Sequence, residues 1–325
     1  IKMTANFNKL DNFLSYMPQT ASEALMREFI ANLDNTGNLE DAIDVADSYS
    51  SITDTRLQST ILGYVMSNEK KCIEKNNARG KTIYGLLKII FLSADTANKI
   101  NLTSLLGIPS IYEIENKQMR DDSGRIIQQV YWYGDKDGKT FFPSFINSFS
   151  PKEWTITSNS EWYEIRSKKG NVWVFANRPL DNDANLDDSA QIHLNNYLAE
   201  NYLHPAVVVH RGHSYWLPRT IKRMTGAAKI IVLGSCGGFK NLNDIIEVNP
   251  DAHIISTKEI GAGDINRPIL NYLNQTFESG KILDWKSMWA SLTKLFAADP
   301  STSLRESWES YIPPYNNLGA IFLKG

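Results

Sequence analysis

Two histidines and one cysteine follow apolar runs that the sequence predicts to be buried strands. The segment VVVHRGHSYW places His210 at the end of one run and His213 beyond a glycine, and IIVLGSCGGF places Cys236 just after the next run. Glycines around a cysteine leave its sulfur accessible and leave backbone N–H groups for an oxyanion. Because an imidazole that takes the proton of a thiol makes it a nucleophile, this pattern is typical of a Cys–His dyad.

The elements that would position these side chains alternate between strand and helix. Apolar strands are predicted at 125–134, 206–209, 229–234 and 252–257, a hairpin at 161–167 and 171–176, and helices near 189–202, 217–225, 241–248, 265–278 and 284–297. This alternation predicts parallel βαβ units, and hence an α/β sandwich with a mainly parallel sheet. Ligands bind at the carboxyl ends of such strands, where the loops DKDGK, HRGHSY and SCGGF lie.

The first third of the chain has a different pattern. From about residue 5 to 107, apolar residues recur at three- and four-residue spacing, and strand signals are nearly absent. We therefore predict an all-helical domain over 1–110, followed by the α/β domain over 111–325.

Composition excludes several classes of protein. The 34 Lys+Arg and 36 Asp+Glu residues give a net charge of −2, without the basic excess that nucleic-acid binding uses. No apolar run approaches the ~18 residues of a membrane span, so we expect a soluble chain. Two cysteines exclude a disulfide scaffold and a four-cysteine zinc site. Because the first residue is Ile1 and not Met, we expect that the N-terminus has been trimmed, which leaves export possible and the compartment open. The sequence does not predict the oligomeric state.

Over roughly residues 125–280, the strand ending in Gly-His-small and the next strand ending in a small residue and Cys resemble the caspase, legumain, gingipain and toxin self-processing group of cysteine peptidases. The resemblance implies a caspase-like sandwich in which His213, after Gly212, and Cys236 are catalytic. The N–H groups of Gly212 and Gly237 would then stabilise the oxyanion. We therefore predict a cysteine endopeptidase that cleaves peptide or protein substrates through a thioester acyl-enzyme, without a cofactor or metal.

Acidic and aromatic residues near the predicted loops have several interpretations. Asp135 or Asp137 could orient His213, attract a basic substrate side chain, or belong to a solvated turn. Glu259 and Asp264 lie in the loop that lines the substrate pocket in the resembled families, where they could select Lys or Arg. Alternatively, that loop is a flexible turn and Asp264 caps the following helix.

Trp216 lies three residues after His213 and could form a wall of the substrate site. Two alternatives to a peptidase remain open. The α/β domain could be a non-catalytic binding or scaffold module, because a fold does not specify a chemistry. His210, His213 and Cys236 could instead bind zinc.

Overall fold

The computed structural model describes residues 10–49, 52 and 54–325, and the chain divides into two compact units. Ile1–Pro109 and Tyr315–Gly325 belong to one unit, and Ser110–Pro314 to the other. The boundary between the two units after Pro109 lies close to the predicted boundary at 110. The C-terminal segment differs from the prediction, because it belongs to the helical unit and not to the α/β unit.

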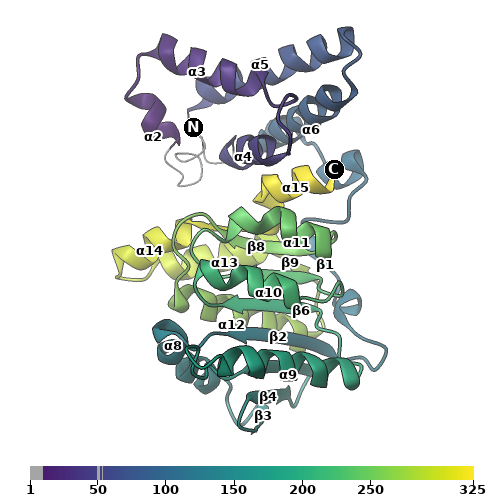
Figure 1. Ribbon diagram of the computed structural model, residues 1–325, viewed down its shortest axis with the longest axis vertical. Coiled ribbons are helices and arrows are strands. Elements are labelled where there is room, and N and C mark those ends of the chain that lie inside the picture. The colour runs from purple at the N-terminus through teal and green to yellow at the C-terminus, as the bar shows by residue number, and fades with distance from the viewer. Residues whose placement is uncertain (1–9, 50–51, 53) are drawn as a thin grey trace. The chain divides into compact units, whose positions relative to one another are not determined.

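The helical unit contains α2 (Leu10–Ser15), α3 (Gln19–Ala31), α4 (Glu40–Tyr49), α5 (Thr55–Glu74), α6 (Ala78–Ala94), α7 (Leu102–Leu106) and α15 (Leu318–Lys324). The long helix α5 begins after Asp54, whose side chain accepts hydrogen bonds from two N–H groups of the first turn. The C-terminal α15 lies beside α4 (Figure 1), where the backbone N–H of Gly319 donates to Asp47 Oδ1 at 2.7 Å. A C-terminal helix completes this unit because its apolar side chains are buried there.

The α/β unit is built on one eight-stranded sheet in the order β10-β8-β7-β6-β2-β5-β4-β3. Its strands are β2 (Ile126–Trp132), β3 (Trp154–Ser158), β4 (Trp162–Ser167), β5 (Val172–Asn177), β6 (Val207–Arg211), β7 (Ile230–Leu233), β8 (His253–Thr257) and β10 (Tyr311–Ile312). The neighbours β8, β7, β6, β2 and β5 are mutually parallel, whereas β10, β4 and β3 each pair antiparallel with a neighbour. A separate antiparallel pair joins β1 (Glu113–Ile114) to β9 (Leu283–Asp284).

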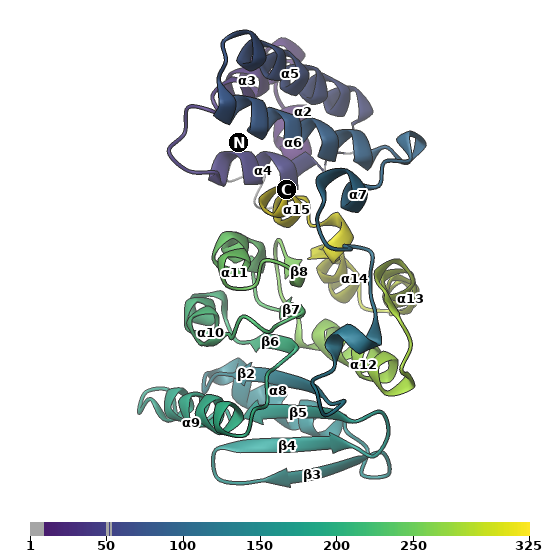
Figure 2. The ribbon, with the colours of Figure 1, turned by 90° about the vertical axis from the view of Figure 1, so that its right-hand side faces the viewer.

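Helices cover both faces of this sheet. They are α8 (Lys136–Asn147), α9 (Leu186–Glu200), α10 (Leu217–Arg223), α11 (Leu242–Val248), α12 (Gly263–Ser279), α13 (Trp285–Ala297) and α14 (Thr302–Glu309). In Figure 2, α9, α10 and α11 lie on one face of the sheet, and α12 and α13 lie on the other. The predicted α/β class, with a mainly parallel sheet and preceding helices, is therefore confirmed.

The strands that carry the candidate site are buried on both faces, which explains their sequences. Every residue of β7 and β2 is buried, and so are the first four residues of β6. Such strands need continuous apolar side chains. The two polar residues of β2 are satisfied, because Gln128 donates to Asn274 Oδ1 at 2.7 Å and Gln129 donates to Asn195 Oδ1 at 2.5 Å.

The eight-stranded sheet contains two strands that the sequence did not predict. The strand β3 pairs antiparallel with β4 at one edge of the sheet, and β10 pairs with β8 at the other edge. The strand β3 is largely exposed and β10 is only two residues long, so neither needs a long apolar run. Within the described residues, no helix combines the length and apolar character needed to cross a membrane.

Candidate active site at the ends of two parallel strands

His213 and Cys236 follow neighbouring strands on the same edge of the sheet. The strands β6 and β7 are parallel, with His210 paired to Leu233, so the loops after both strands emerge at their carboxyl ends. Both loops line one pocket of about 170 Å³. These two segments contribute Arg211, Gly212, His213, Gly234, Ser235 and Cys236. The remaining walls come from the end of β2, from α8 and from the start of α12 with the loop before it, through Trp132, Asp137, Gly138, Phe141, Ile260, Gly261 and Gly263.

The sulfur of Cys236 is accessible to solvent. Cys236 is an exposed free cysteine, whereas Cys72, in the helical unit, is buried. The next residue, Gly237, has φ +62°, a left-handed conformation that favours glycine, and the chain turns there into the short 3-10 helix Gly238–Asn241. This turn lifts Cys236 out of the buried end of β7, so its thiol can meet a ligand in the pocket.

The two predicted oxyanion donors lie in different situations. The N–H of Gly237 donates to the carbonyl oxygen of Glu259 at 2.9 Å, so it is already engaged. Gly212 lines the pocket, and its N–H donates no hydrogen bond to any residue that the structure describes. Glycine is required at 212 because a Cβ there would lie 2.4 Å from Cδ2 of the buried Tyr133 ring.

The imidazole of His213 lies between an acid and an aromatic ring. Its Nε2 is 3.5 Å from Oδ2 of Asp137, and its ring stacks on Tyr215 with the centroids 5.2 Å apart. Asp137 belongs to the first turn of α8. No hydrogen bond joins His213 to Cys236 in the described part of the chain, so the two share the pocket without direct contact.

Asp135 has a different task from Asp137. It is the N-cap of α8, where its Oδ1 accepts from the N–H of Gly138 at 2.8 Å. Its other oxygen accepts from Nε1 of Trp216 at 3.1 Å. The run DKDGK is therefore the start of a helix and not a solvated turn, and of its two acids only Asp137 faces His213.

Comparison of the chain with protein-family models, curated proteins and solved structures found no match. The chemistry of the site therefore has to be read from its own side chains. These are a thiol, an imidazole and a carboxylate around one pocket, which is the set of groups that nucleophilic catalysis by cysteine uses.

Trp216 does not line the pocket. Its ring stacks on Tyr133, with centroids 5.2 Å apart and planes 4° from parallel, and Tyr133 donates its hydroxyl to the carbonyl of Trp216 at 3.2 Å. Burial raises the pKa of Tyr133 to about 12, so its hydroxyl stays protonated and shares its hydrogen between this carbonyl and Thr220 Oγ1, which lies 2.7 Å away. Trp216 thus anchors the histidine loop, and the exposed ring beside His213 is Tyr215.

His210 is a buried support for the same loop. Its Nε2 lies 3.1 Å from the carbonyl oxygen of Gly212 and 3.2 Å from that of His213, and its Nδ1 lies 2.7 Å from Thr220 Oγ1. Since carbonyl oxygens only accept, Nε2 carries the hydrogen and Nδ1 accepts from the hydroxyl. Burial lowers the pKa of His210 to about 4, so the ring is neutral at neutral pH.

These contacts bear on the zinc alternative. Both nitrogens of His210 are engaged within the protein, so neither is available to a metal. Among the described residues, no group of three or more His, Cys, Asp or Glu side chains is placed to hold a metal ion. The proposed ligand set of His210, His213 and Cys236 therefore does not assemble.

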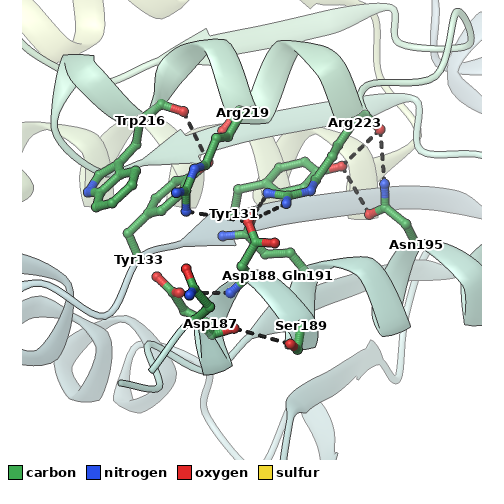
Figure 3. Close-up of polar contacts among 12 residues, drawn as sticks. Tyr131, Tyr133, Asp187, Asp188, Ser189, Gln191, Asn195, Trp216, Arg219 and Arg223 are labelled. Carbon is green, nitrogen blue, oxygen red and sulfur yellow. Dashed lines mark hydrogen bonds and ion pairs between the residues drawn. The ribbon is translucent and has the colours of Figure 1, made fainter. Parts of the chain in front are cut away.

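A polar network behind the histidine loop joins α9 to α10 (Figure 3). Arg223 donates to Gln191 and to Asp188, and Nδ2 of Asn195 donates to the carbonyl of Arg223 at 3.0 Å. Gln191 also donates to the carbonyl of Trp132, at the end of β2, at 2.8 Å. The helix α10 follows the histidine loop, and Arg223 is its last residue. These bonds therefore hold α10, and with it the end of the histidine loop, against the sheet.

The acids predicted to form a specificity pocket lie outside it. Asp264 is in the first turn of α12, where Arg267 lies 3.3 Å from its Oδ1. Glu259 contributes the carbonyl that accepts from Gly237. Besides Asp137, the charged residue that lines the pocket is Arg211, the last residue of β6, which was not predicted as a site residue. The sequence feature that could have identified Arg211 is its position at the end of a predicted strand, directly before Gly212.

Proposed function

We propose that this protein is a cysteine endopeptidase of the caspase-like type, with Cys236 as nucleophile and His213 as its proton acceptor and donor. The observation that carries the proposal is that His213 and the exposed Cys236 follow adjacent parallel strands and line one pocket. A buried structural cysteine would need neither the exposure nor a neighbouring histidine.

The first half of the reaction forms a thioester. His213 takes the proton of the Cys236 thiol as the sulfur bonds to the substrate carbonyl carbon, and the carbonyl oxygen becomes an oxyanion. The free N–H of Gly212 is the backbone donor best placed to stabilise this charge. The tetrahedral intermediate then expels the amine, which receives the proton from His213.

The second half releases the acid product. Water gives a proton to His213 and attacks the thioester carbon, and breaking of the carbon–sulfur bond returns the proton to Cys236. Asp137 beside Nε2 favours the tautomer that carries its hydrogen there, so Nδ1 is the atom that exchanges protons with the sulfur. Substrate binding must bring His213 and Cys236 closer, as catalytic hydrogen bonds often tighten in the substrate complex.

The test is cleavage of a fluorogenic peptide library by the full chain and three variants. We expect C236A and H213A each to lose at least about a thousandfold in kcat/KM, because nucleophile and base act as a unit. The control C72S removes the buried cysteine of the other unit and is expected to retain activity. Cleavage that survives in C236A would contradict the proposal.

A second measurement separates an enzyme from a binding module. Iodoacetamide should modify Cys236 more slowly in H213A than in the wild type, because the imidazole no longer takes the thiol proton. Equal rates, together with no cleavage of any peptide, would favour the non-catalytic module.

A further inference from the structure

A buried threonine of the neighbouring strand holds the turn that carries Cys236. Thr257 is the last residue of β8, and its side chain is fully buried. Its hydroxyl donates to the carbonyl oxygen of Ser235 and accepts from the N–H of Gly238 at 3.3 Å. One side chain is thus bonded to the backbone on both sides of Cys236.

The register of the sheet places this hydroxyl beside the turn. The parallel strands β7 and β8 pair Val232 with Ile255. Two residues further along, Thr257 therefore lies level with Gly234, just beyond the last residue of β7. The branched side chain of threonine suits a buried strand, and its hydroxyl is both a donor and an acceptor. Valine has nearly the same shape but can make neither hydrogen bond.

The bond to Ser235 orients the peptide group that enters Cys236. In a trans peptide, the C=O and the N–H that follows it point in opposite directions. The described part of the chain contains no cis peptide bond. Because the Ser235 carbonyl is directed at Thr257, the N–H of Cys236 is directed away from it. Thr257 therefore fixes the orientation of the backbone at the nucleophile.

Other contacts hold the ends of the same turn. Nδ2 of Asn266, in α12, donates to the carbonyl oxygen of Gly234 at 3.0 Å. The N–H of Gly237 donates to the carbonyl oxygen of Glu259 at 2.9 Å, a backbone bond that a substitution does not remove. Within the described residues, Thr257 is the side chain that bonds the peptide group directly before Cys236.

We propose that Thr257 is a positioning residue for Cys236, whose hydroxyl holds the thiol where His213 can take its proton. This inference rests on the proposed peptidase function. Thr257 does not line the pocket, so it acts through Cys236 and not on the substrate. The glycines on both sides of Cys236 offer no side chains to pack, so hydrogen bonds must restrain the turn. Proton transfer needs hydrogen-bond reach, and a displacement of about 1 Å costs about a hundredfold in rate.

The first experiment compares T257V, which lacks the hydroxyl, with T257S, which keeps the hydroxyl and lacks the methyl group. The substrate is the peptide of the fluorogenic library that the wild type cleaves fastest. We expect T257V to lower kcat by at least about tenfold and to change KM by less than about threefold, because only the nucleophile moves. T257S should retain at least about half of the wild-type kcat, because the hydrogen bonds remain.

Labelling by iodoacetamide measures the position of the thiol without turnover. At pH 7.5, T257V should slow the labelling of Cys236 by at least about threefold, and T257S should restore the wild-type rate. In the H213A background, T257V should have no further effect, because Thr257 acts by holding the thiol near the imidazole.

A matched control removes another threonine hydroxyl of the same unit. The hydroxyl of Thr293 accepts from Nε1 of Trp308 at 3.0 Å, and neither residue lines the pocket, so T293V should change neither measurement. Urea unfolding checks that each variant is folded under the assay conditions. If T257V does not fold, T257A removes the same hydroxyl with less crowding and carries the same expectations.

The outcomes separate this inference from the proposed function. Equal losses of kcat in T257V and T257S, or an equal slowing of labelling by T257V with and without His213, would overturn the positioning role. Cleavage that needs Cys236 and His213 but is unchanged in T257V leaves the peptidase standing and overturns this inference. Slower labelling that T257S restores and that requires His213, with no cleavage of any peptide by the wild type, supports the positioning role and contradicts the peptidase.

Discussion

Nε2 of His213 lies 3.5 Å from Oδ2 of Asp137, a carboxylate in the first turn of the helix that starts where β2 ends. Two segments far apart in the sequence thus meet at one imidazole: the loop after β6, which carries His213, and the helix α8, which carries the acid. The strand β7 leads to Cys236 in the same pocket. Removal of the acid should therefore affect proton transfer more than folding.

Exchange of Asp137 for asparagine tests this role. We expect D137N to lower kcat/KM by about ten- to a hundredfold, because an amide no longer favours the required tautomer of His213. Stability should change by less than about 1 kcal/mol, since the side chains are 41% and 57% exposed and surface ion pairs contribute little. Kinetics and urea unfolding of the same preparation measure both quantities.

The control is D135A, which removes the neighbouring acid. This substitution should lower the free energy of unfolding by about 1 kcal/mol, because it deletes the N-cap of α8 and the acceptor for Trp216. If D135A and D137N had the same effect on activity and the same effect on stability, the two acids would not have separate roles.

How far the sequence predicts this site depends on the kind of contact. The runs that became β6 and β7 are continuous and apolar, because both strands are buried on both faces, so their ends and the residues after them were readable. The edge strand β3 has only its first residue buried, and β10 has two residues. Neither leaves a periodic pattern to detect.

Side-chain direction and backbone pairing were beyond the sequence. The start of α8 decides which acid of DKDGK faces His213. Asp135 is the N-cap of this helix, whereas Asp137 is its second residue. The N–H of Gly237 is engaged by a carbonyl of the loop after β8, a contact between distant segments with no local signal. Arg211 was missed because its place in the wall of the pocket is visible only once the fold is known.

His210 should make stability depend on pH. Its pKa is about 4 in the folded chain, against an ordinary value of 6.5, so between these values the unfolded chain binds more protons. The contribution of neutral His210 to the free energy of unfolding is therefore complete above about pH 6.5 and is lost as pH falls toward 4. At pH 5 the loss is about 2 kcal/mol. Urea unfolding of wild type and H210Q at pH 7.5 and pH 5 measures it, and an equal pH dependence in both would refute the assignment.

The same substitution should have opposite effects at two glycines. G212A places a methyl group 2.4 Å from the ring of Tyr133, which is stacked on Trp216, so we expect a loss of about 1–3 kcal/mol and weaker activity as the His213 loop shifts. Gly63 lies inside α5 with nothing within 4 Å of an added Cβ, so G63A should stabilise by about 0.5–1 kcal/mol. Thermal unfolding compares the two, and equal shifts would contradict this packing.

The two cysteines should differ sharply in labelling. Burial raises the pKa of Cys72, and Asp34, whose Oδ2 lies 3.7 Å from its sulfur, raises it further. Iodoacetamide at pH 7.5 should therefore modify the exposed Cys236 in the native chain and reach Cys72 only after unfolding in urea. Peptide mapping by mass spectrometry distinguishes the sites, and fast native labelling of Cys72 would show that the core of the helical unit opens readily.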